Sequence, residues 1–176
     1  MMMLVQAATP QTLEDGLIRA AAQGDRAAFG ELYSRYARMV HGILLARVPP
    51  ADAEDLMQDV FLSAMNRLGT LRAAAAFPGW LASIARHRAL DHFREARKFA
   101  PLDERAARSP ATDGAGAAAL EVLELIRSLP EAYRETLILR LVEGMTGPEI
   151  AARTGLTPES VRVNLCRGMK MLRRLL

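Results

Sequence analysis

Basic and polar side chains near the C-terminus have the types and spacing needed to contact nucleic acid. From Ala151 to Leu176 there are six basic residues and a single acidic one, Glu159. Arginine and lysine neutralise phosphates, while amide, hydroxyl and guanidinium groups hydrogen-bond to base edges in the major groove of DNA. On a helical wheel, one face and its flank collect the side chains that we predict to contact DNA: Thr157, Ser160, Arg162, Val163, Asn164, Arg167 and Lys170.

The residues around this basic segment predict two short helices joined by a tight turn. Thr146 and Glu149 have the spacing of a capping box, and Thr157 followed by a proline is typical of a second helix start. Gly155 supplies the left-handed residue of the turn. Apolar residues repeat every three or four positions to give the second helix a buried stripe: Val161, Leu165, Met169, Leu172 and Leu176. The pattern favours a helix-turn-helix that reads DNA; a packed helical hairpin with a solvated basic face is the alternative.

A second basic element is the helix predicted from Pro78 to Lys98. Trp80 and Leu81 belong to its predicted inward stripe. The opposite face carries three arginines with two apolar residues among them: Arg86, Arg94, Arg97, Leu90 and Phe93. Guanidinium groups neutralise phosphates and an aromatic ring can stack on an unpaired base. We therefore predict that the arginines bind DNA, although a solvated basic face would show the same pattern.

Acidic residues gather in the segment from residue 52 to residue 59. Asp52 is the expected N-cap of a helix, and Glu54, Asp55 and Asp59 follow before any basic residue. Each carboxylate near a helix N-terminus stabilises it by roughly 0.3–1 kcal/mol, so part of the cluster is ordinary helix chemistry. Four acids exceed what a cap needs, and they predict a docking surface for a basic partner protein.

Sequence patterns for catalysis or metal binding are weak. The three histidines are scattered, and Cys166 is the only cysteine, so neither a zinc site nor a disulfide framework is expected. No glycine-rich phosphate loop or Ser-His-Asp arrangement can be assembled. We expect a protein that is not an enzyme and that holds no metal or cofactor. A single cysteine, no signal peptide and no long apolar run predict a cytoplasmic protein without membrane insertion.

Helical periodicity throughout, without β-branched alternation, predicts an all-α fold. Asp25 is the expected N-cap of one long helix, and Tyr33 belongs to the predicted buried face of that helix. Composition divides the chain into two small helical domains, residues 11–98 and 119–176. Between them, residues 99–118 are rich in alanine, proline, serine and glycine, which indicates a flexible linker. The net charge of +3 is small, so the distribution of charge, rather than its sum, points to nucleic acid.

Taken together, the chain resembles the extracytoplasmic-function (ECF) sigma factors of bacterial RNA polymerase, within the sigma-70 family. The resemblance is carried by four stretches: GDRAAFGELY from residue 24, DAEDLMQDVF from residue 52, FPGWLASIAR from residue 77, and Leu129-Pro130 through the helix-turn-helix. It implies that the first domain is sigma region two and the second is sigma region four. Two places depart from the family pattern: Arg162-Val163-Asn164 stands where many members have Lys-Ser-Arg, and residues 71–76 are alanine-rich. The promoter sequence therefore does not carry over.

The resemblance also implies partners and site residues. Asp52, Asp55, Gln58 and Asp59 would dock on the clamp of the largest subunit of core RNA polymerase, and the flap of the second-largest subunit would be a further contact. Residues 70–76 and the fourth helix would read the minus-ten promoter element and hold its melted non-template strand, while the helix-turn-helix would read the minus-thirty-five duplex. An anti-sigma factor is the expected inhibitor. The alternatives are a stand-alone helix-turn-helix regulator, a small enzyme, and an adaptor that binds protein only.

Overall fold

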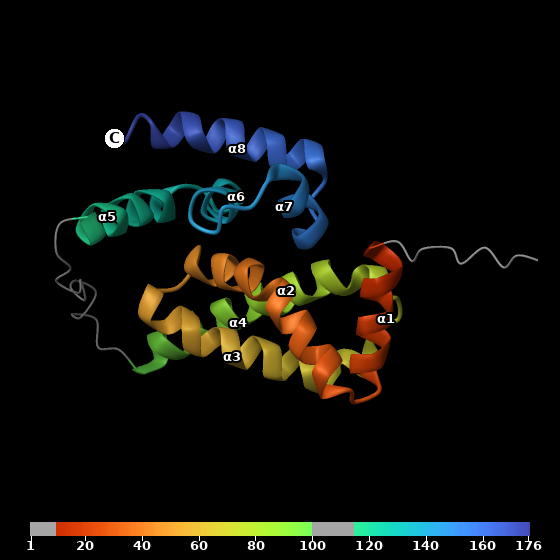
Figure 1. Ribbon diagram of the computed structural model, residues 1–176. Coiled ribbons are helices and arrows are strands. Elements are labelled where there is room, and N and C mark those ends of the chain that lie inside the picture. The colour runs from red at the N-terminus through yellow and green to blue at the C-terminus, as the bar shows by residue number, and fades with distance from the viewer. Residues whose placement is uncertain (1–9, 100–114) are drawn as a thin grey trace, which may run out of the picture.

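Helices account for all the regular structure of the computed structural model, which describes residues 10–99 and 115–176 (Figure 1). Within these ranges there is no strand, so the all-α prediction is confirmed. The α-helices are α1 (Pro10–Ala22), α2 (Arg26–Leu45), α3 (Pro50–Arg67), α4 (Phe77–Phe99), α5 (Ala115–Ser128), α6 (Glu131–Leu141), α7 (Gly147–Thr154) and α8 (Pro158–Leu172), with short 3-10 turns at Leu68–Thr70 and Ala74–Ala76. Most of the predicted linker, residues 100–114, lies outside the described residues.

Two predicted helix boundaries have different outcomes. Asp25 caps α2 as expected, because its carboxylate accepts the backbone N–H groups of Ala27 and Ala28 at 2.9 and 3.0 Å. The prediction that Asp52 caps α3 is wrong, since that helix begins at Pro50 and Asp52 lies in its first turn. A proline has the fixed φ of a helix start and no N–H that needs a partner there, so the prolines at 49 and 50 set the boundary.

Helix α2 is the central element of the molecule. Figure 1 shows it with α1, α3 and α4 on one side and α6 and α7 on the other, and α2 packs against each of these five helices. Met39, Val40, Ile43 and Leu44 are all completely buried. Every residue from Gly42 to Leu45 is buried, and four successive residues point to all sides of a helix, so α2 is covered on more than one side.

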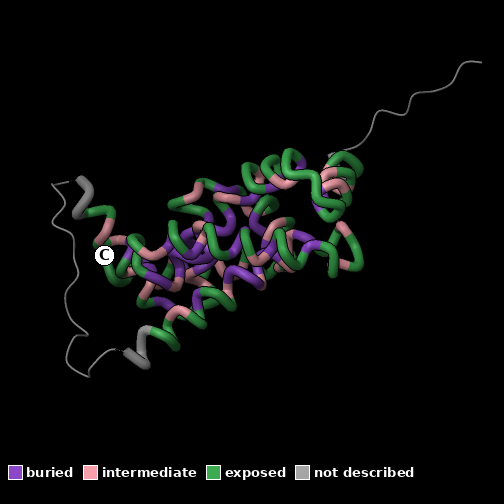
Figure 2. The backbone as a smooth tube through the Cα atoms, turned by 90° about the horizontal axis from the view of Figure 1, so that it is seen from below, coloured by how far each residue is buried: buried purple, intermediate pink, exposed green. Residues whose placement is uncertain are grey.

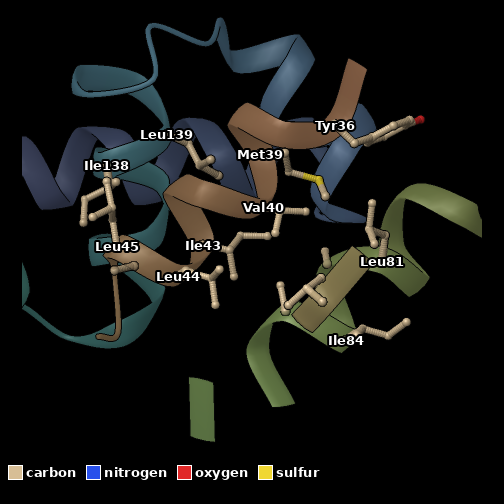
Figure 3. Close-up of a cluster of buried hydrophobic side chains, with 14 of the residues drawn as sticks. Tyr36, Met39, Val40, Ile43, Leu44, Leu45, Leu81, Ile84, Ile138 and Leu139 are labelled. Carbon is tan, nitrogen blue, oxygen red and sulfur yellow. The ribbon is translucent and has the colours of Figure 1, made fainter. Parts of the chain in front are cut away.

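The two halves of the chain share one hydrophobic core. Buried residues run continuously from α1–α4 into α5–α8, as the tube coloured by burial shows (Figure 2). In Figure 3, Ile138 and Leu139 of α6 lie beside residues of α2 such as Leu45 and Ile43. The halves that the sequence predicts as two bodies on a tether are therefore packed against each other.

Two residues of the predicted apolar stripes are exposed instead. Tyr33 lies at the surface of α2, with its ring centroid 4.5 Å from that of Phe61. Leu176 follows the end of α8 and is also exposed. Helical periodicity assigned both residues inward, but a stripe ends where the neighbouring helix or the helix itself ends.

Candidate nucleic-acid interface

The helix-turn-helix of α7 and α8 is built by the caps that the sequence predicts. The Thr146 hydroxyl accepts the backbone N–H of Glu149 at 3.4 Å, and the Glu149 carboxylate accepts the N–H of Thr146 at 2.7 Å. The hydrogen bond from the Thr146 backbone, helped by the Thr146 hydroxyl, holds the pKa of Glu149 below its usual value. Gly155 ends α7 at φ 77°, and Thr157 caps α8. The capping predictions are confirmed.

The outward face of α8 presents the basic residues predicted to contact DNA. Arg162 is 77% exposed and pairs with Glu159, which is 80% exposed, at 3.6 Å. Such an exposed pair contributes little, so the guanidinium of Arg162 remains available to a phosphate or base. Arg167 and Lys170 are also exposed, and Val163 and Asn164 are half-buried.

Two further predicted contacts, Thr157 and Ser160, pair with each other at the start of α8. The Thr157 hydroxyl accepts the backbone N–H of Ser160 at 3.1 Å and donates to its hydroxyl at 2.8 Å. Both residues are exposed. The structure therefore brings the polar and basic residues predicted for α8 to one end and one face of that helix.

Close packing on α6 fixes the position of α8. A Cβ atom built on Gly168 would lie only 3.0 Å from Leu137 Cδ1 and 3.1 Å from Tyr133 Cβ. Gly168 is thus the residue that lets the two helices approach, and the sequence interpretation missed it. Its signal was available, because a glycine inside a helix costs about 1 kcal/mol relative to alanine and usually has a packing reason.

Helix α4 presents part of its predicted basic face. Leu90, Phe93 and Arg94 are exposed as expected, and Arg94 pairs with the exposed Asp91 at 3.6 Å. Arg97 lies near the end of α4, outside the residues whose side chains the structure describes. Arg86 does not share this exposed face, because it turns toward α6.

Arg86 belongs instead to a cluster of charged groups between α2, α4 and α6. It donates to Glu135 twice, from Nη2 to Oε1 at 2.7 Å and from Nε to Oε2 at 3.1 Å. Arg47 donates from Nη2 to Glu135 Oε2 at 2.6 Å and to Glu131 at 2.7 Å. The exposed fraction of the side chain is 7% for Glu135, 10% for Arg47 and 31% for Arg86.

The charges in this cluster stabilise one another. Burial by itself raises the pKa of Glu135, but the hydrogen bonds and positive charges of Arg86 and Arg47 outweigh it and hold that pKa below its usual value. The hydrogen bond to Glu135 raises the pKa of Arg86 in turn. Sequence patterns could not reveal this cluster, because its members are far apart along the chain.

The residues of α3 that are predicted to bind polymerase divide into two groups. Asp55, Gln58 and Asp59 are exposed on one face, and within the described ranges neither aspartate forms an ion pair. Asp52 is half-buried, with Oδ2 3.2 Å from Nε2 of His92 on α4. Leu62 continues the exposed face one turn beyond Asp59, which makes a mixed acidic and apolar surface.

Other chemistry finds no support among the residues that the structure describes. No group of three or more histidine, cysteine, aspartate or glutamate side chains is placed to hold a metal ion there. No helix in that part of the chain has both the length and the apolar character needed to cross a bilayer.

Comparison with known proteins connects these surfaces to one family. The Sigma-70 region 2 family model matches residues 32–99 and the Sigma-70, region 4 model matches residues 119–172. The chain belongs to the ECF sigma factors of the sigma-70 family. It is 34% identical over 162 residues to the RNA polymerase sigma factor CarQ of Myxococcus xanthus, which covers 87% of this chain and 91% of CarQ. The ECF RNA polymerase sigma factor SigM of Mycobacterium tuberculosis is 30% identical over 165 residues, covering 91% and 83% of the two chains.

A solved relative has the same fold. The structure of CnrH, determined in complex with the cytosolic domain of CnrY, superposes with a TM-score of 0.63 at 27% identity and covers 92% of this chain and 96% of that one. CnrH is the sigma factor of that name from Cupriavidus metallidurans. The matched ranges place most of α2, with α3 and α4, in region 2, and α5–α8 in region 4. The protein is an RNA polymerase sigma factor, a non-enzymatic class, as the sequence predicts.

Proposed function

We propose that this sigma factor recruits core RNA polymerase through α3 and directs it to promoters through α4 and α8. The observation that carries the proposal is the separation of charge on the exposed surface. One face of α3 is acidic, and one face of α8 is basic. One chain can therefore bind a basic protein surface and DNA at the same time.

The proposed polymerase contact is the exposed face of α3. Asp55, Gln58 and Asp59 are one helical turn apart, so they can meet a single partner helix. Within the described residues the two aspartates have no ion-pair partner, so their charges remain available to basic groups on the clamp of the largest subunit. Asp52 would contribute at the edge of this face, because it is partly engaged by His92.

The proposed promoter contacts lie on α4 and α8. Arg162 and Arg167 stand on the N-terminal half and middle of α8, the part of a recognition helix that enters the major groove, and would read the minus-thirty-five duplex. On α4, Arg94 and the exposed ring of Phe93 offer charge and stacking to the melted non-template strand of the minus-ten element. Arg86 would join them once it is released from Glu135.

Region 4 also offers a surface for a further partner. An apolar groove of about 380 Å³ runs between α5 and the end of α6, lined by Val122 and the exposed Leu141 and Val142. The flap of the second-largest polymerase subunit is the proposed occupant. An anti-sigma factor is a proposed inhibitor, in keeping with the complex between CnrH and the cytosolic domain of CnrY. These proposed partners support a cytoplasmic location for the protein.

Transcription in vitro with core polymerase, this protein and a library of promoter sequences tests the proposal. We expect new start sites that depend on the protein. The double variant Asp55→Lys/Asp59→Lys should abolish co-purification with core, whereas Glu121→Lys, an exposed reversal on α5, should not. Arg162→Ala and Arg167→Ala should each weaken promoter-dependent transcription and leave core binding intact.

Two results would contradict this function. Initiation at the same sites with and without the protein would remove the sigma role altogether. Tight, sequence-specific binding of duplex DNA by the isolated chain at physiological salt would favour the stand-alone helix-turn-helix regulator instead, since such a protein needs no polymerase to bind its site.

A further inference from the structure

An arginine predicted to bind DNA is occupied by a carboxylate from the other half of the same chain. Arg86 lies on α4 of region 2, and Glu135 lies on α6 of region 4. The two hydrogen bonds between them are parallel, from Nη2 to Oε1 and from Nε to Oε2. Arginine uses the same forked geometry to bind phosphate. Glu135 therefore fills the position on Arg86 that a DNA phosphate would take.

The carboxylate is well suited to hold the two halves together. Glu135 is almost completely buried, and a buried carboxylate is strongly unfavourable unless it is paired and hydrogen-bonded. Its ion-pair partners among the described residues, Arg86 and Arg47, come from region 2. When the halves separate, all the ion pairs of Glu135 across the interface are lost together.

Two arginines of region 4 bind the C-terminal end of α2. Arg127 donates to the carbonyl of Leu45 at 2.9 Å and also to that of Val48, and Arg134 donates to the carbonyl of Ala46 at 3.1 Å. The last carbonyls of a helix have no partner within the helix and carry partial negative charge. Region 4 thus supplies the capping groups for a helix of region 2, which makes the packed arrangement specific.

The packed arrangement also covers part of the predicted reading surface of α8. Asn164 lines a groove of about 550 Å³ together with Arg86, Glu135 and Leu156. In this arrangement Arg86 and Asn164 both face the space between the halves. A promoter whose two elements are bound by α4 and α8 would need the groove to open.

We propose that Glu135 competes with promoter DNA for Arg86. The ionic cluster of Glu135, Arg86 and Arg47 keeps the free chain closed. When this cluster breaks, the chain opens and Arg86 is free to bind the phosphate backbone. The DNA half of this inference rests on the proposed function. The closed state itself does not. It is a property of the isolated chain that can be measured without polymerase or promoter.

The first measurement is the distance between the halves in the full-length chain. Cys166 is exposed on α8 and is the only native cysteine, so Asn66→Cys, at an exposed position on α3, gives a defined pair of dye sites. Glu135→Gln should raise the ratio of open to closed molecules roughly tenfold to a hundredfold, the effect of losing a charge-assisted hydrogen bond to a buried group. The matched control is Glu131→Gln, which removes an exposed carboxylate from the same helix and the same Arg47, and should stay within about fivefold of the parent.

A second variant reaches the same state by a different route. Arg127→Gln removes the hydrogen bonds to the end of α2 and leaves Glu135 in place, so it should also increase the inter-dye distance. Circular dichroism reports whether each variant keeps its helices. An unchanged distance in both folded variants would overturn the closed state held by these contacts.

The second measurement is binding of a fluorescein-labelled single-stranded oligonucleotide by anisotropy, without polymerase. Glu135→Gln should bind more tightly than the parent, and adding Arg86→Ala should remove that gain. Opening without tighter binding, or a gain that survives Arg86→Ala, would overturn the competition for Arg86. Loss of the sigma role would appear only in transcription and would leave the distance measurement unaffected, so the two failures are distinguishable.

Discussion

Gly42 lies where α2 packs against α6, and replacing it tests whether region 2 and region 4 are packed together in solution. A Cβ at this position would lie 2.6 Å from Leu139 Cδ2 and 2.9 Å from Glu143 Cγ. Carbon atoms in contact prefer a separation of about 3.5–4.0 Å. Gly42→Ala therefore forces α6 away from α2 or distorts the completely buried Leu139.

The magnitude follows from two opposing effects. Overpacking a well-filled core costs roughly 1–3 kcal/mol. Replacing a glycine inside a helix by alanine returns about 1 kcal/mol through helix propensity. Gly30 provides the matched control, because it lies in the same helix, is exposed, and has no atom within 4 Å of a Cβ built on it. Gly30→Ala should gain about 1 kcal/mol, and Gly42→Ala should fall below it by about 1–3 kcal/mol.

Urea unfolding followed by circular dichroism measures this difference. The two variants should unfold with the same dependence on urea, so that their midpoints compare directly. If Gly42→Ala stabilises the protein as much as Gly30→Ala, Leu139 does not contact α2 in solution. The shared core of the two halves would then be refuted, and with it the closed state.

Two further predictions concern a histidine and a cap. Nδ1 of His41 on α2 lies 2.7 Å from Oε1 of Glu143, just after α6. That hydrogen bond raises the pKa of His41 above 6.5 although burial opposes the rise. The negative charges of Glu143 and Glu54 raise it further. The pair therefore stabilises the packed halves fully below pH 6.5 and loses this contribution as the pH rises through the raised pKa. The difference in urea midpoint between the parent and His41→Gln should therefore shrink as the pH increases. A difference that stays constant with pH would contradict this prediction. Thr146→Ala removes one side of the capping box with Glu149 and should lower the unfolding free energy by about 1 kcal/mol in the same assay; an unchanged value would show that α7 does not depend on its cap.

Local signals predicted the helices because their causes are local. The cap at Asp25, the capping box at Thr146 and the left-handed Gly155 depend on residues within one turn, and the structure has all three. The start of α3 was missed where two local signals compete. Both Asp52 and Pro50 favour a helix start, and the fixed φ of the proline decided it.

The packing of the halves could not be predicted in the same way. The consecutive buried residues from Gly42 to Leu45 indicate that α2 is covered on more than one side, but periodicity does not say which helices cover it. No local sequence signal distinguishes Glu135 from the other charged residues of α6. Its burial is explained by its hydrogen bonds with residues 47 and 86, which lie more than 40 positions away in the sequence.

The positive charge of region 4 serves two different purposes. Arg162 and Arg167 face outward on α8, whereas Arg127, Arg134 and Arg153 face region 2. Arg153 donates to the carbonyl of Arg35, and its guanidinium lies 5.0 Å from the centroid of the Tyr36 ring, a cation–π contact.

A count of arginines therefore overstates how many of them can neutralise phosphates in the closed chain. The salt dependence of DNA binding reports the number of phosphates neutralised. If opening releases Arg86, the slope of log affinity against log salt should be steeper for Glu135→Gln than for its parent, by about one contact. An equal slope would mean that the arginines between the halves never reach DNA, and that α4 binds it through Arg94 and its neighbours alone.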